Sequence, residues 1–169
     1  MQRIEEPLER VTGAHHLYHT FGLESSRPGA CLQHVESADE SCLVHLAGNC
    51  LVFIELSSST RRYLLAIGDR GLGSFVVHPS HKYLAVGETG ENPNLYVYKY
   101  PQLCVHKILQ SGALNSFACM CFSHNGEKLA SVSTAPDFML TIWDWAEQRM
   151  LLHSKVQNTC AQLAVICCE

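Results

Sequence analysis

The stretch Phe138-Met-Leu-Thr-Ile-Trp-Asp-Trp145 decides the fold of this 169-residue chain. Its side chains alternate in a way that is typical of a β-strand with two different faces. One face would carry Met139, Thr141, Trp143 and Trp145, and the other would carry Leu140, Ile142 and Asp144. A single Trp-Asp dipeptide is a weak signal, so its value depends on whether the same pattern recurs elsewhere in the sequence.

The pattern recurs upstream in a constant register. Residues 77–86 align with residues 122–131, and the offset of 45 residues continues through the following strand. At this offset three pairs of positions coincide: Leu84 with Leu129, Val97 with Ile142, and Tyr98 with Trp143. A fainter copy aligns Phe53-Ile54 with Val97-Tyr98 at an offset of 44. Repeats of this length that hold four strands each predict the blades of a β-propeller.

Short apolar runs begin near residue 30, and Gly, Pro, Asn and Asp separate them. Such spacing, without a long helical pattern, favours an all-β architecture. We expect strands at residues 31–35, 42–47, 51–56, 63–67, 74–78, 83–87, 95–100, 105–109, 117–122, 128–133, 139–145 and 150–154.

The strands divide the chain into a leader and a repeat region. Residues 1–29 are polar and end in the turn signal Ser25-Ser-Arg-Pro-Gly29, which predicts a partly disordered leader. Residues 30–169 would form a partial propeller with blades at about 30–67, 71–110 and 116–155, and residues 158–168 would start a fourth strand set. A closed propeller needs at least four blades, so we expect a fragment or truncated product of a longer chain. We also expect that it does not fold stably as a monomer, because both outer blades are uncapped.

Three motifs carry a family resemblance. Phe122-Ser-His-Asn-Gly126 resembles the turn after the first strand of a WD repeat, Leu129-Ala-Ser-Val-Ser133 its second strand and Leu140-Thr-Ile-Trp-Asp144 its third. The resemblance implies a WD40-like β-propeller of about three four-stranded blades. The Gly-His dipeptide of the family is missing, and Gly112-Ala113 is the nearest match. The hydrogen-bonded His, Ser and Asp network behind the tryptophan is therefore incomplete.

A closer resemblance runs through residues 73–88, residues 92–101 and the two later motifs, within roughly residues 20–155. These segments resemble the start of the first propeller of the large cilia- and flagella-associated WD-repeat proteins. The resemblance implies a non-catalytic scaffold of the axoneme in motile cilia and flagella, with axonemal or dynein-associated proteins as partners and a role in dynein regulation and motility. Two alternatives stay open: a general WD-repeat adaptor, such as a ubiquitin-ligase substrate receptor or trafficking scaffold, and an enzyme built on a propeller.

Composition excludes several other classes of protein. Hydrophobic residues make up 47% and charged residues 17%, which is typical of a globular chain. The net charge is −4 without a dense basic run, so nucleic acid is a poor candidate partner. The sequence has neither the apolar run of a signal peptide nor one of about 20 residues that could span a membrane. We therefore expect an intracellular, soluble protein that binds no membrane. The family resemblance implies a location in the cytoplasm or cytoskeleton and no small-molecule substrate.

No catalytic, cofactor or metal site is predicted from the reactive side chains. The nine cysteines lack the paired spacing of zinc modules, so we expect free thiols packed as small apolar groups. His15, His16 and His19 could bind metal only on a helix, and His78, His81 and His124 fall in turns, where a structural role is expected. His45 and His106 interrupt strands and are expected to face solvent.

The residues that we single out are therefore structural blade positions. Asp137 and Asp144 belong to a turn and a strand end and not to a catalytic pair, and Trp143 is expected to pack against a neighbouring blade. The full set is Trp143, Asp144, Tyr98, Asp137, Leu84 and Leu129.

Overall fold

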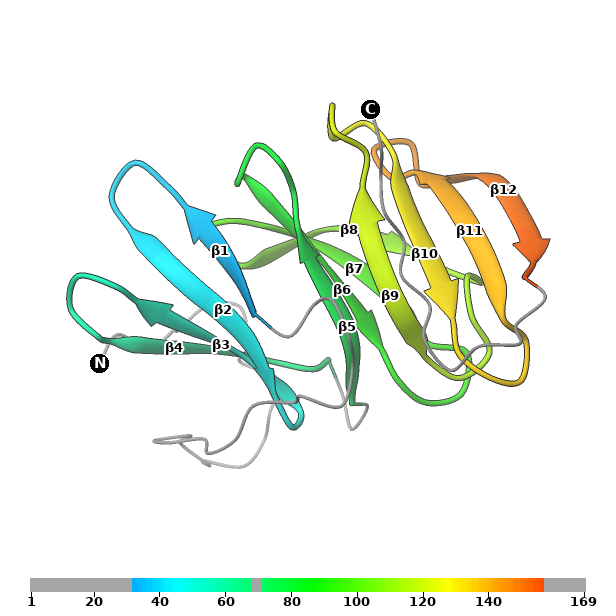
Figure 1. Ribbon diagram of the computed structural model, residues 1–169, viewed down its shortest axis with the longest axis horizontal. Coiled ribbons are helices and arrows are strands. Elements are labelled where there is room, and N and C mark those ends of the chain that lie inside the picture. The colour runs from blue at the N-terminus through cyan, green and yellow to red at the C-terminus, as the bar shows by residue number, and fades with distance from the viewer. Residues whose placement is uncertain (1–31, 68–70, 157–169) are drawn as a thin grey trace.

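The computed structural model describes residues 32–67 and 71–156, which form three four-stranded antiparallel sheets (Figure 1). We call them blade 1 (β1–β4), blade 2 (β5–β8) and blade 3 (β9–β12). Blade 1 contains β1 (Leu32–Glu36), β2 (Ser41–Ala47), β3 (Cys50–Glu55) and β4 (Arg61–Leu65). Blade 2 contains β5 (Leu72–Val77), β6 (Tyr83–Glu88), β7 (Leu95–Lys99) and β8 (Cys104–Leu109). Blade 3 contains β9 (Phe117–Phe122), β10 (Leu129–Ser133), β11 (Met139–Asp144) and β12 (Arg149–Lys155).

Each blade is a simple meander in which consecutive strands pair. The prediction of an all-β fold with four strands in each repeat is confirmed. The twelve expected strands are present, and their ends differ from the expected ones by at most two residues. The expected leader and the expected start of a fourth strand set lie outside the described residues. Within the described ranges the blades do not close into a ring, and no helix there is long and apolar enough to cross a membrane.

The blades stack through the faces of their sheets, with the first strand of each blade closest to the first strand of the next. Figure 1 shows blade 2 between the other two. One apolar cluster joins blades 1 and 2, and a second joins blades 2 and 3. Because neighbouring residues of a strand point to opposite faces, Tyr98 enters the first cluster and Val97 the second. Phe53 of blade 1 faces blade 2 just as Val97 faces blade 3, which confirms the offset of 44.

Candidate interaction surface

Trp143 fixes the connection between blades 2 and 3. Its side chain is 2% exposed, and its indole Nε1 donates a hydrogen bond to Ser131 Oγ over 3.0 Å. Gly112, in the connection between β8 and β9, lies so close to the indole that an added Cβ would come within 2.6 Å of Trp143 Cζ2. Only a residue without a side chain fits there. The buried indole therefore holds both its own sheet and the chain segment that enters blade 3.

Asp137 ties the turn before β11 to the same connecting segment. Its Oδ2 accepts a hydrogen bond from the backbone N–H of Leu114 over 3.1 Å. Nearby, Thr134 N donates to Ser116 O over 2.9 Å, and Asn115 Nδ2 donates to Ala135 O over 3.3 Å. The network behind the tryptophan thus contains two bonds. One joins Trp143 to Ser131, and the other joins Asp137 to the backbone N–H of Leu114, next to Gly112-Ala113, the nearest match to the missing Gly-His dipeptide.

Blade 2 has the equivalent aromatic residue without the hydrogen bond from an indole to a serine hydroxyl. Tyr98 takes the place of Trp143 and is 4% exposed, and Val86 takes the place of Ser131. The apolar surroundings of Tyr98 raise the pKa of its phenol, because burial penalises the phenolate. Leu84 and Leu129, at equivalent positions of the two blades, are 1% and 0% exposed. The repeat thus brings equivalent residues to equivalent blade interfaces.

Asp144 lies at the other end of β11 from Asp137. Its Oδ2 is 3.0 Å from Lys128 Nζ and 3.8 Å from Arg149 Nη2, and its Oδ1 accepts the Glu147 N–H over 3.4 Å. The hydrogen bond from Lys128 holds the pKa of the Asp144 carboxyl below its ordinary value. The six-residue strand separates the two aspartates by about 20 Å, so they cannot act on one reacting group.

His78 and Trp145 meet at Gly126, at the turn end of the same interface. His78 Nε2 is 3.0 Å from the Gly126 carbonyl oxygen, and Trp145 Nε1 donates to that oxygen over 2.8 Å. The Gly126 φ angle is +74°, and an added Cβ would lie 2.2 Å from the His78 ring. Burial lowers the pKa of His78. His78 is therefore a packed structural histidine, as expected from its position in a turn.

The sequence did not single out Arg62, which joins blades 1 and 2. Its guanidinium forms an ion pair with Glu40 and donates to Tyr100 Oη over 3.3 Å. It also lies 5.9 Å from the centre of the Phe53 ring and 5.8 Å from that of Tyr100. Its side chain is only 16% exposed, so this cation is packed beside two stacked aromatic rings and one carboxylate. The sequence gives no clear signal for this role, because Arg62 follows Arg61 and precedes the expected strand at residues 63–67.

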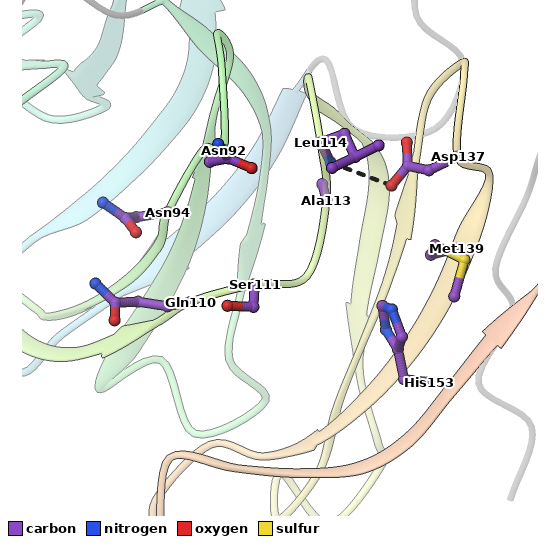
Figure 2. A pocket seen from close by; sticks show the side chains of 9 residues that line it. All are labelled: Asn92, Asn94, Gln110, Ser111, Ala113, Leu114, Asp137, Met139 and His153. Atoms are coloured by element: carbon purple, nitrogen blue, oxygen red, sulfur yellow. Dashed lines mark hydrogen bonds between the residues drawn. The ribbon is translucent and has the colours of Figure 1, made fainter.

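A cavity of about 510 Å³, lined by both polar and apolar side chains, lies where the loops of blades 2 and 3 meet (Figure 2). Asparagine and glutamine side chains of blade 2 lie on one side of it in Figure 2, and residues of blade 3 lie on the other. Its lining consists of Asn92, Asn94, Gln110, Ser111, Ala113, Leu114, Asp137, Met139 and His153. Asp137 is the one carboxylate among these lining residues, and His153 is the one imidazole.

The reactive side chains form no chemical centre in the part of the chain that the structure describes. No group of three His, Cys, Asp or Glu residues there is arranged to hold a metal ion. No disulfide bond joins the cysteines that the structure describes, which are Cys42, Cys50, Cys104, Cys119 and Cys121. His15, His16 and His19 lie outside the described residues. His45 and His106 were both expected to face solvent, and both are half-buried; the His106 ring stacks on the Tyr83 ring at 5.3 Å.

Comparison with known proteins places this architecture in a family. Residues 29–163 match the family described as the CFAP43 N-terminal domain. The chain belongs to that family. Over 139 residues, 82% of its length, it is 34% identical to cilia- and flagella-associated protein 44 of Mus musculus. Over 87% of its length it is 36% identical to cilia- and flagella-associated protein 44 of Chlamydomonas reinhardtii, and over 70% it is 27% identical to protein 43 of Mus musculus.

The CFAP43 N-terminal family match covers all three blades, so the WD-repeat resemblance is confirmed for the described part of the chain. The chain spans only 7 to 8% of the length of these relatives. It is therefore related to cilia- and flagella-associated proteins through a short segment of each.

Proposed function

We propose that the chain is part of a non-catalytic interaction scaffold in the axoneme of motile cilia and flagella, where it supports dynein regulation and motility. The observation that carries this proposal is the 34 to 36% identity, over more than four-fifths of the chain, to proteins named as cilia- and flagella-associated. A more distant relative, 23% identical over 72% of the chain, is named echinoderm microtubule-associated protein-like 2 of Rattus norvegicus, which agrees with a cytoskeletal location.

The geometry of the blades supports binding and not catalysis. The first strands of blades 2 and 3 are mostly buried and supply mainly apolar side chains, as in Phe75-Val-Val77. The polar groups instead gather at the loop ends, where the packed indole of Trp143 and the carboxylate of Asp137 hold the backbone in place. Rigid strands that present loops in this way bind other proteins without needing a cofactor. The partners in this proposal are axonemal or dynein-associated proteins.

The domain boundaries belong to the same proposal. A leader at residues 1–29 precedes the repeat region at 30–169, whose blades span about 30–67, 71–110 and 116–155. The structural positions of the repeat region are Trp143, Asp144, Tyr98, Asp137, Leu84 and Leu129. They keep the loops in register with the sheets.

Localisation in ciliated cells tests the proposed function. A fluorescently tagged protein that contains this chain should follow the axoneme along the whole cilium, and its depletion should reduce the beat frequency. A cytosolic protein with the same tag controls for passive entry into cilia. A wholly nuclear or diffuse cytosolic signal, or cilia that beat normally after depletion, would rule out the axonemal role.

A further inference from the structure

The cavity between blades 2 and 3 is lined by a carboxylate, that of Asp137, whose charge is compensated only in part. Asp137 Oδ2 accepts one hydrogen bond, from the Leu114 N–H, and Asp137 Oδ1 is buried without a hydrogen-bond partner. No salt bridge joins Asp137 to a cation among the described residues. One neutral N–H offsets only part of a full negative charge. Because Oδ1 is buried, an occupant of the cavity approaches the carboxylate through Oδ2, the oxygen that faces Leu114 in Figure 2. The cavity therefore favours a positively charged occupant.

The rest of the lining complements the carboxylate. Asn92, Asn94 and Gln110 bring side-chain amide oxygens, which accept hydrogen bonds, to the side of the cavity opposite Asp137 (Figure 2). Ala113, Leu114 and Met139 bring apolar surface. A guanidinium has several N–H donors in one plane and a long apolar stem, so it can use both kinds of wall at once. An ammonium has fewer donors and is more strongly hydrated, so it would gain less here.

The size of the cavity agrees with a side chain that enters from another protein. Its volume of about 510 Å³ lies within the usual range of ligand sites and exceeds the space that one arginine side chain needs. Leu114 is 49% exposed, so the rim is open to an approaching chain. Two basic side chains of β12 lie near this site. Lys155 is opposite Met139 in the β11–β12 register and is exposed, so it could compete for the carboxylate from the rim. His153 lines the cavity itself, with its Nδ1 2.8 Å from Thr141 Oγ1.

We propose that this cavity is a docking site for an arginine side chain in a basic segment of a partner protein, with Asp137 as its counter-ion. The proposal deepens the interaction role argued above by naming the chemistry of the partner. It does not depend on the ciliary location, because the binding can be measured with purified components. Loss of axonemal localisation would therefore leave this site untouched, and failure of arginine binding would leave the localisation untouched.

The test uses the complete chain, labelled with ¹⁵N, and the capped tripeptide acetyl-Gly-Arg-Gly-amide. The matched probe replaces arginine by citrulline, which has nearly the same shape and no charge. With the arginine peptide at up to about 10 mM, we expect saturable shifts of the Leu114 and Met139 backbone amides and of the Asn92, Asn94 and Gln110 side-chain amides. The citrulline peptide should leave these signals in place. Equal shifts with both peptides, or none with arginine, would overturn the proposal.

Variants assign the effect to the carboxylate. Asp137→Asn keeps an oxygen for the Leu114 N–H and should weaken arginine binding about tenfold or more, because the charge is lost. Asp39→Asn removes the same charge from an exposed loop of blade 1 and should change binding less than about twofold, since solvent screens it. If both variants weaken binding equally, the cavity is not the site.

Two variants are expected to gain affinity, which a misfolded protein could not do. Gln110→Glu adds a second carboxylate to the lining at an exposed position, and Lys155→Gln removes the competing cation. Each should tighten arginine binding by about two- to fivefold at low salt, and the gain should shrink as salt is added. Unchanged or weaker binding in both variants would contradict an electrostatic site between these blades.

Discussion

Replacing Trp143 by phenylalanine tests whether the indole bond holds blade 3 together. The indole Nε1 donates to Ser131 Oγ over 3.0 Å, and the two residues are 2% and 0% exposed. Neither group can reach water in the folded chain. The phenylalanine keeps an aromatic ring against Gly112 but removes the N–H, so Ser131 is left without its donor.

The expected cost follows from these contacts. Trp143→Phe should destabilise the fold by about 1–3 kcal/mol for the unpaired Ser131 hydroxyl, plus about 1 kcal/mol for the lost ring volume. Ser131→Ala leaves the indole N–H unpaired and should also cost about 1–3 kcal/mol. The double variant has no orphaned polar group, so only the volume term remains. It should therefore be more stable than the sum of the single effects predicts, by about 1–2 kcal/mol or more.

Urea unfolding followed by far-ultraviolet circular dichroism measures this coupling. All variants are compared at one protein concentration, because self-association would make the midpoint depend on concentration. Ser154→Ala on the exposed β12 is the matched control and should change the free energy of unfolding by less than about 0.5 kcal/mol. Single effects that add within about 0.3 kcal/mol would refute the bond as a source of stability.

Three further changes probe the other interface contacts. Arg62→Met should lower the free energy of unfolding by about 2–4 kcal/mol, because it leaves Glu40 as an uncompensated, mostly buried charge. Adding Glu40→Gln should restore part of this stability in thermal unfolding, and no restoration would contradict the ion pair. Gly112→Ala should lower the free energy of unfolding by about 1–3 kcal/mol, because the added Cβ would collide with the Trp143 indole. The same collision should weaken the near-ultraviolet circular dichroism of the tryptophans. An unchanged spectrum and an unchanged unfolding midpoint would argue against that contact. Burial places the pKa of His78 below its ordinary value of 6.5, so the unfolded chain takes up the proton first as the pH falls. The contribution of His78 to stability is therefore fully present above pH 6.5 and is lost as the pH decreases further. The loss of stability between roughly pH 7.5 and 5.5 should therefore be smaller in His78→Gln, whereas equal losses would show that His78 is not responsible.

The strand positions and their faces could be predicted from the sequence because they depend on local alternation and on the repeat. The offset of 45 residues brings Leu84 and Leu129, which are 1% and 0% exposed, to equivalent interfaces. It likewise puts Tyr98 and Trp143 on the faces that point back toward the preceding blade. When the repeat keeps one register over two strands, it identifies which face of each strand packs against another blade, even where the position of that blade is unknown.

His106 shows where local alternation fails. The register between β7 and β8 shifts at Val97 and Tyr98, which pair with Lys107 and Val105 and leave His106 as the extra residue. A bulge of this kind changes the direction of a side chain without a clear mark in the sequence. The His106 ring consequently stacks on Tyr83 and is half-buried instead of fully exposed.

The Arg62 contacts and the cavity could not be predicted for a different reason. Arg62 meets Tyr100 across 38 residues, and the cavity combines loops of two blades. Such contacts depend on how one blade is placed against the next, which a repeat pattern does not specify. Asp137 was correctly expected in a turn of its blade, but its link to Leu114 of the preceding connection became visible only in three dimensions.

Equivalent positions of blades 2 and 3 show that the burial of a side chain depends on the neighbouring blade as well as on the residue itself. Leu95 and Val97 are both 0% exposed because they face blade 3. Their equivalents one repeat later, Leu140 and Ile142, lie on the matching face of blade 3 and are only half-buried. Sequence and strand geometry are equivalent at these positions, so the difference comes from what lies against the sheet. Alternation therefore predicts which side chains a blade offers for packing, and only the structure tells how far each is covered.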